Sequence, residues 1–149
     1  TNALATYKSN LKRFVSETRK KGGTPVLVTS MERSGGVERP TLGDYPPTVR
    51  DVAREENVTL IDLNAMSLVF YRALGTNLLK GFQDPTHHNN YGSYELARCI
   101  VHGIRHSKLK LARSLVPELS DFDPAHPDPF ETFYMPPSPG PVGARPLGD

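Results

Sequence analysis

Residues 24–29 have the sequence Thr-Pro-Val-Leu-Val-Thr, in which three apolar residues stand together between polar neighbours. A short, continuous apolar run predicts a β-strand, and it favours a parallel strand covered on both faces over a half-exposed strand of alternating character. Because purely parallel strands occur almost only where helices cover both faces of a sheet, this stretch indicates the α/β fold class.

The segments on either side have the pattern of amphipathic helices. Upstream, the residues of one mostly apolar helix face recur at helical spacing until Gly22-Gly23 ends the pattern. This face consists of Leu4, Tyr7, Leu11, Phe14, Val15 and Thr18. Downstream, residues 30–43 form a polar, glycine-rich loop, after which Asp44 can cap a second helix with Pro46 and Pro47 in its first turn. The core-facing residues of this helix are expected to be Tyr45, Val49, Val52 and Ala53.

The alternation of helices and strands continues along the chain. Residues 58–62, Val-Thr-Leu-Ile-Asp, predict a second strand, and Asn64 can cap a third helix that ends at Leu74. Residues 76–90 predict a loop, followed by a fourth helix from about Tyr91 to Ser107. The apolar face of that helix is Leu96, Ala97, Ile100, Val101 and Ile104. This order of elements is typical of doubly wound α/β domains.

Two strands are too few for such a sheet to stand alone. Because the chain opens at Thr1 rather than at methionine and enters a helical pattern at once, we expect the missing strands upstream of Thr1 or in another chain. Most of the 14 prolines follow Val116, which predicts a domain portion in residues 1–116 and a proline-rich extension in residues 117–149. Four aromatic residues favour an extension wrapped on the domain over a disordered one: Phe122, Phe130, Phe133 and Tyr134.

The composition is that of an ordinary globular protein. Of the 149 residues, 37% are hydrophobic and 23% are charged. A formal net charge of +2 gives no argument for nucleic acid, and no apolar run approaches the ~20 residues that a transmembrane helix requires, so we expect neither nucleic acid nor a membrane as partner. The single cysteine, Cys99, excludes an intrachain disulfide and is expected to be a small buried helix residue.

The stretch with the clearest chemical meaning is residues 84–92, Asp-Pro-Thr-His-His-Asn-Asn-Tyr-Gly. A serine hydrolase requires an imidazole that accepts the hydroxyl proton and a carboxylate that fixes the tautomer of that imidazole. Asp84 and His87 can supply both from one loop, which Pro85 stiffens. Asn89 or Asn90 can cap the following helix, and Gly92 allows its first turn to approach neighbouring backbone closely. Asp-x-x-His is frequent by chance, but its position before an amphipathic helix favours catalysis.

Asp84-x-x-His87-x-Asn89-x-x-Gly92, with Ala97 in the following helix, resembles the last conserved block of the SGNH (GDSL-like) hydrolases. More narrowly, the chain from about Tyr7 to Arg105 resembles bacterial rhamnogalacturonan acetylesterase-like proteins. Four stretches carry this resemblance in family order: TPVLVTS (24–30), GDYPPTVR (43–50), ENVTLIDL (56–63) and DPTHHNNYG (84–92). The resemblance implies a three-layer, flavodoxin-like parallel sheet of which this chain supplies the C-terminal half. It also implies no metal or organic cofactor, and a secreted or periplasmic location.

The resemblance implies catalytic roles for Asp84 and His87 only. In that family the nucleophilic serine lies in a Gly-Asp-Ser motif, and two further blocks give the glycine and asparagine of the oxyanion hole. This sequence has neither Gly-Asp-Ser nor Gly-x-Asn-Asp, and its Gly43-Asp44 is followed by Tyr45. We therefore expect His87 to be the general base and then the general acid, with Asp84 orienting it. The nucleophile is expected from a missing N-terminal half or a complementary chain.

Two other groups of residues have functional interpretations. Ser34 lies in a loop without a fixed elbow or oxyanion donors, so we do not expect a nucleophile there. That loop is expected to border the active-site crevice, where its charged residues could touch an acidic sugar or simply be solvated; they are Glu32, Arg33 and Arg39. His102 and His106 have a spacing that metals use, but no cysteine or carboxylate is placed in the sequence to complete the set and Arg105 lies between them, so we predict no metal site.

The resemblance thus implies a carbohydrate esterase that removes acetyl groups from a plant cell-wall polysaccharide such as pectic rhamnogalacturonan, this chain carrying the Asp-x-x-His part of the triad. Two alternatives stay open. The chain can be a non-catalytic SGNH-fold module that binds carbohydrate or a partner chain, which the missing serine block favours. The parent protein can also be a lipase or acylhydrolase that acts on another ester.

Overall fold

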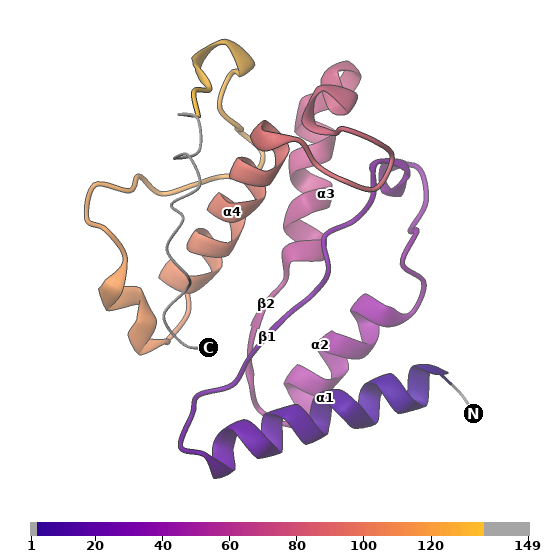
Figure 1. The fold of residues 1–149 in the computed structure, drawn as a ribbon, viewed down its shortest axis with the longest axis vertical. Coiled ribbons are helices and arrows are strands. Elements are labelled where there is room, and N and C mark those ends of the chain that lie inside the picture. The colour runs from indigo at the N-terminus through magenta and orange to yellow at the C-terminus, as the bar shows by residue number, and fades with distance from the viewer. Residues whose placement is uncertain (1–2, 136–149) are drawn as a thin grey trace, which may run out of the picture.

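The chain has a mixed α/β fold in a computed structural model that describes residues 3–135 (Figure 1). The regular elements are α1 (Ala3–Lys20), β1 (Val26–Val28), α2 (Tyr45–Glu55), β2 (Thr59–Ile61), α3 (Leu63–Leu74) and α4 (Asn90–Arg105). Short 3-10 segments are η1 (Ser34–Val37), η2 (Gly75–Gly81), η3 (Lys110–Ser114) and η4 (Phe130–Thr132). The α/β class and the predicted order of helices and strands are confirmed.

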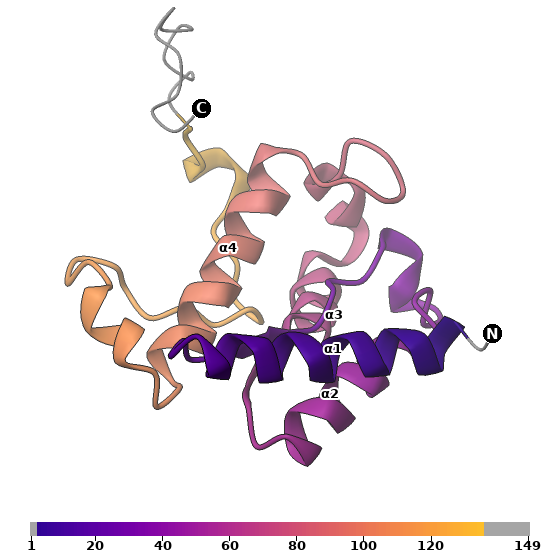
Figure 2. The same ribbon diagram turned by 60° about the horizontal axis from the view of Figure 1, so that its bottom comes forward.

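The two strands lie parallel, with Leu27 opposite Leu60 and Val28 opposite Ile61. Because strand side chains alternate between faces, the two leucines share one face of the sheet and the other pair shares the opposite face. Leu27 and Leu60 join a core with residues of α1 and α2; its buried members are Val15, Leu27, Val49, Val52 and Ala53. Helices α1 and α2 therefore cover one face, with α1 lying across α2 (Figure 2).

Two residues predicted to face this core are exposed instead. Phe14 is 58% exposed, because Val15, one position along the helix and about 100° around its axis, takes the core position. Tyr45 is 45% exposed, because it opens α2 at the surface, where its ring packs edge-on against Tyr7 at 5.0 Å between centroids.

Helices α3 and α4 form a second core on the other side; its buried members are Leu63, Phe70, Tyr71, Leu74, Phe82, Tyr91, Leu96, Cys99 and Phe122. Helix α4 approaches β2 closely, since a Cβ built on Gly103 would lie 2.6 Å from the side chain of Ile61. Val28 of β1, however, is 43% exposed on this same face. Helix α4 covers β2 but leaves Val28 of the neighbouring β1 exposed. The prediction of a strand covered on both faces is therefore wrong for β1 within residues 3–135.

The helix ends differ from the sequence prediction in two caps. The side chain of Asp44 makes no capping bond, and α3 is capped by Asp62, whose Oδ1 accepts from the N–H of Ala65 at 3.3 Å, rather than by Asn64. Asn89 caps α4 as predicted, accepting from the N–H of Gly92 at 3.0 Å.

The buried face of α4 differs from the predicted one at Ala97, which is exposed rather than buried. Glu95 is buried in the turn that also carries Leu96, and Cys99 is buried as predicted.

The proline-rich segment runs back along α4 (Figure 1). Phe122 is buried, and the rings of Phe130 and Phe133 pack on Tyr91 at 4.2 and 5.5 Å between centroids, so wrapping is confirmed for these three residues. Tyr134 is 79% exposed. Residues 136–149 of the predicted extension lie outside the described part, and the division at Val116 stays a prediction.

None of the helices in residues 3–135 has the length and apolar character to cross a membrane.

Candidate active site

Asp84 and His87 face each other in the loop that leads into α4. Oδ2 of Asp84 lies 2.7 Å from Nδ1 of His87, and Oδ1 accepts hydrogen bonds from the backbone N–H groups of Thr86 and His87, each at 2.7 Å. The backbone bond from His87, followed by the bond from its side chain, lowers the pKa of Asp84 to about 2. Asp84 is therefore a carboxylate at neutral pH.

This contact determines what His87 can do. A proton on Nδ1 that is donated to Asp84 leaves a lone pair on Nε2, which can then accept a proton from a hydroxyl group. Within residues 3–135, Nε2 makes no hydrogen bond, and the side chain is 68% exposed. The orientation is the one that a triad histidine requires.

The loop around the pair is held by backbone contacts. The carbonyl of His87 accepts from the N–H of Gln83 at 2.9 Å, and the Asn89 side chain donates to the carbonyl of Lys80 at 2.6 Å. Gly92 is required by the close approach of α4 to this loop, because a Cβ there would lie 2.1 Å from the carbonyl oxygen of Gly81. The predicted role of Gly92 is confirmed.

His88, next in sequence, faces into the protein. Its Nε2 lies 2.6 Å from the hydroxyl of Tyr71, which donates to the carbonyl of Glu32 at 2.7 Å. Its ring lies 4.2 Å from that of Phe82. Burial, followed by the charge of His87, lowers the pKa of His88, so this ring is a neutral packing residue.

The sequence contains a second Asp-Pro-x-His, at Asp123–His126, that sequence reasoning did not weigh. Nδ1 of His126 lies 2.8 Å from Oδ2 of Asp123, so the carboxylate–imidazole contact forms twice. The side chain of His126 is 83% exposed, and its loop does not lead into a helix of the core. The contact alone therefore does not identify a site, and the anchoring of the Asp84 loop between α3 and α4 distinguishes the two.

The loop of residues 30–43 contacts the Asp84 loop, since the backbone N–H of Ser34 donates to the carbonyl of Pro85 at 3.2 Å. The hydroxyl of Ser34 donates to the carbonyl of Pro85 at 3.1 Å rather than to a histidine, so this serine joins the two loops. Glu32 is buried, and its carboxylate accepts from the backbone N–H of Arg33 and from the hydroxyl of Thr41. The interpretation of Glu32 as a sugar contact is wrong; Arg33 and Arg39 are exposed.

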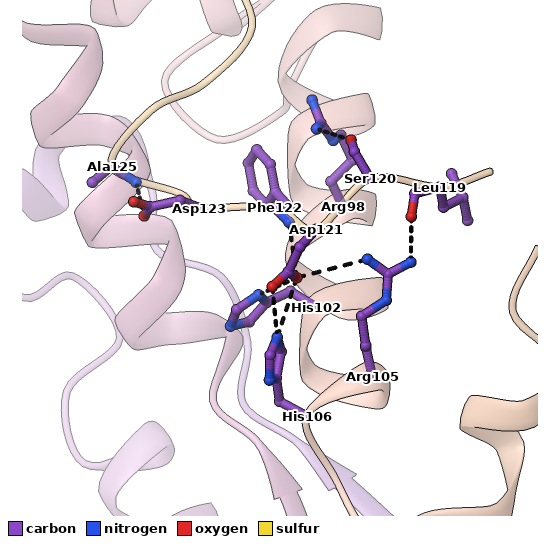
Figure 3. A network of polar contacts seen from close by, with 10 residues as sticks. All are labelled: Arg98, His102, Arg105, His106, Leu119, Ser120, Asp121, Phe122, Asp123 and Ala125. Carbon is purple, nitrogen blue, oxygen red and sulfur yellow. Dashed lines mark hydrogen bonds and ion pairs between the residues drawn. The ribbon is translucent and has the colours of Figure 1, made fainter. Parts of the chain in front are cut away.

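Two polar clusters were missed by sequence reasoning. Arg50 binds Asp62 through Nε at 2.8 Å and Nη2 at 2.9 Å, and Thr29 donates to Asp62 at 2.8 Å, which joins α2 to the C-terminal ends of both strands. Asp121 contacts both His102 and His106, so the statement that no carboxylate completes this pair is wrong (Figure 3). Both clusters join residues more than ten positions apart, which local spacing does not reveal.

A carboxylate–imidazole pair in a loop of an α/β fold fits the class of α/β serine esterases. The chain is 34% identical over 128 residues to the probable rhamnogalacturonan acetylesterase YesY of Bacillus subtilis (strain 168). It is 33% identical over 137 residues to the rhamnogalacturonan acetylesterase RhgT of the same organism. The matches cover 79% and 78% of this chain but 59% of each relative.

The chain is therefore partially homologous to rhamnogalacturonan acetylesterases of the SGNH family, and the predicted resemblance is confirmed. It spans less than two thirds of the length of these relatives. No family model and no solved structure gives a match.

Proposed function

We propose that this chain is the C-terminal portion of a serine esterase that removes acetyl groups from a rhamnogalacturonan-type plant cell-wall polysaccharide, with Asp84 and His87 as the carboxylate and base of its triad. The observation that carries the proposal is the 2.7 Å contact between Oδ2 of Asp84 and Nδ1 of His87, made in a loop that is anchored to α4 and leaves Nε2 open. Homology to rhamnogalacturonan acetylesterases supports the substrate class.

The chemistry follows from this geometry. Nε2 of His87 takes the proton of a serine hydroxyl as the serine oxygen attacks the acetyl carbonyl, and Asp84 stabilises the imidazolium that forms. His87 then gives the proton to the sugar oxygen as the acetyl C–O bond breaks. Water, deprotonated by the same nitrogen, releases acetate from the acyl-serine. The serine and the oxyanion donors come from residues outside this chain, since no Gly-Asp-Ser occurs in it.

The fold supports a role as part of a larger sheet. We infer that β1 and β2 belong to a three-layer, flavodoxin-like parallel sheet completed by strands from outside this chain. A sheet of two three-residue strands is small for such an architecture, and Val28 is 43% exposed where a further layer would cover it. The relatives, of which this chain spans 59%, are long enough to supply those strands.

The test measures acetate release from acetylated rhamnogalacturonan by the complete protein. His87→Ala is expected to abolish turnover, and Asp84→Asn to lower kcat by ~10⁴-fold because the wrong tautomer is then favoured. His126→Ala, in the second Asp-Pro-x-His, is the matched control and should retain turnover. Wild-type rates in the first two variants, or loss of turnover in His126→Ala, would overturn the assignment.

A second candidate function is a non-catalytic module that binds acetylated polysaccharide, which the absence of a Gly-Asp-Ser motif favours. Residues 1–149 alone are expected to hydrolyse p-nitrophenyl acetate no faster than free imidazole, because one lost oxyanion donor already costs ~10²–10³ in rate. Addition of an upstream fragment with the serine should restore turnover in the esterase. Saturable polysaccharide binding without turnover by the complete protein would instead establish the module.

A further inference from the structure

Three side chains of metal-ligand type gather at the C-terminal end of α4, the end opposite to the Asp84 loop (Figure 3). His102 and His106 lie one helical turn apart, with 4.3 Å between their ring centroids. Asp121 comes from the proline-rich segment and points between the two rings. One nitrogen of each histidine and a carboxylate oxygen all lie within 4.8 Å of one another.

The separations suit a small divalent cation. Zinc binds imidazole nitrogen at about 2.0–2.1 Å and carboxylate oxygen at about 2.0–2.2 Å, which at a tetrahedral angle places two ligand atoms about 3.3 Å apart. Oδ1 of Asp121 lies 3.3 Å from Nδ1 of His102 and 3.1 Å from Nε2 of His106. An ion can thus be held by these atoms with only small side-chain movements.

The surroundings include a cation. Arg105 pairs with Oδ1 of Asp121 through Nη1 at 3.7 Å, the longest of the side-chain contacts to this carboxylate, while its Nη2 is held by the carbonyl of Leu119 at 2.6 Å. The backbone N–H of Phe122 donates to Oδ1 of Asp121 at 3.0 Å, which orients the carboxylate as an outer-shell donor does in metal sites. All three ligand side chains are accessible to solvent, so an ion can enter.

We propose that His102, His106 and Asp121 form a binding site for a divalent transition-metal ion of the zinc type. Two ligands come from one turn of α4 and the third from the segment that follows it. The bound ion therefore fastens residues 107–121 to the helix. Water completes the tetrahedral set. The site is separate from Asp84 and His87 and does not depend on the esterase proposal.

The experiment is a calorimetric titration of the complete protein, freed of metal by a chelator, with zinc chloride. We expect one ion per chain at this site, and a loss of affinity of at least about tenfold in His106→Gln and in Asp121→Asn. His126→Gln is the matched control, because His126 also contacts a carboxylate at 2.8 Å but has no second histidine beside it in the described structure. His87→Gln controls for binding at the Asp84 loop. Both controls should bind as wild type.

A second readout separates ligand loss from misfolding. Zinc should protect the peptide bonds of residues 107–120 from limited proteolysis in wild type and in both controls, but not in His106→Gln or Asp121→Asn. Circular dichroism should show equal helix content in all variants without metal. Wild-type zinc affinity in the two site variants, no binding in the wild type, or loss of binding in His87→Gln would each overturn the proposal.

Discussion

His87 and His88 are adjacent in sequence but make opposite contacts: Nδ1 of His87 lies 2.7 Å from Asp84 at the surface, whereas Nε2 of His88 lies 2.6 Å from the hydroxyl of Tyr71 in the interior. The two rings therefore serve different ends. His87 is the proton acceptor of the proposed mechanism, and His88 holds the loop against α3 through Tyr71.

This difference predicts opposite phenotypes for two matched substitutions in the complete protein. His87→Ala should remove turnover of an acetyl ester and leave the melting temperature close to that of the wild type, because the ring is exposed. His88→Ala should keep most of kcat but lower stability by about 1–3 kcal/mol, because the buried hydroxyl of Tyr71 loses a partner. Measurements of kcat and of the melting temperature on both variants check these two predictions. Loss of turnover in His88→Ala together with loss of stability in His87→Ala would contradict the assigned roles.

The low pKa of Asp84 rests first on the backbone N–H of residue 87, which any side chain at that position keeps. In His87→Gln, the pKa of Asp84 should therefore stay below its ordinary value of 3.8. A folded-state pKa below the unfolded one means that Asp84 favours the fold above pH ~4, and that this contribution is lost as the pH falls towards about 2. Carbon-13 NMR titration of the Asp84 carboxyl group in His87→Gln measures this pKa directly. A pKa of 3.8 in that variant would assign the lowering to the imidazole of His87 instead.

Gly92 makes the close contact between α4 and the backbone of Gly81, which leads into the Asp84 loop. Gly92→Ala would place a methyl group 2.1 Å from the carbonyl oxygen of Gly81, a backbone atom that cannot move aside alone. We expect a loss of stability of at least about 1–3 kcal/mol and a fall in kcat from displacement of the loop. Gly35→Ala is the control, since its nearest neighbour lies at 3.8 Å. Equal melting temperatures for the two variants would contradict this account.

Glu95 gives the fold a pH dependence. It is fully buried in α4, and burial, followed by the charge of Asp128, raises its pKa to about 7. Because the folded state favours the protonated form, the contribution of Glu95 to stability is largest below pH ~4.5 and declines by up to about 3 kcal/mol as the pH rises to about 7. Glu95→Gln should flatten this slope in thermal melts between pH 4.5 and 8. Glu38→Gln, at an exposed position, should not.

Local sequence was sufficient for the order of elements and for the Asp84–His87 pair. Helical spacing, Gly22-Gly23 and the apolar run of residues 26–28 act within a few positions, so each could be assigned from its own segment. The Asp84 turn is equally local, because its hydrogen bonds join residues two and three apart. For the same reason the pattern could not separate it from Asp123–His126, which forms the same local contact.

Long-range packing determined the rest. The inward orientation of His88 is accompanied by its contact with Tyr71, 17 positions away, and the backbone N–H of the buried Glu32 donates to Ser67, 35 positions away. Asp121 meets His102 and His106 only because the proline-rich segment folds back along α4. Such contacts depend on where whole elements lie in three dimensions, and the periodicity of one segment contains no information about which distant segment will cover it.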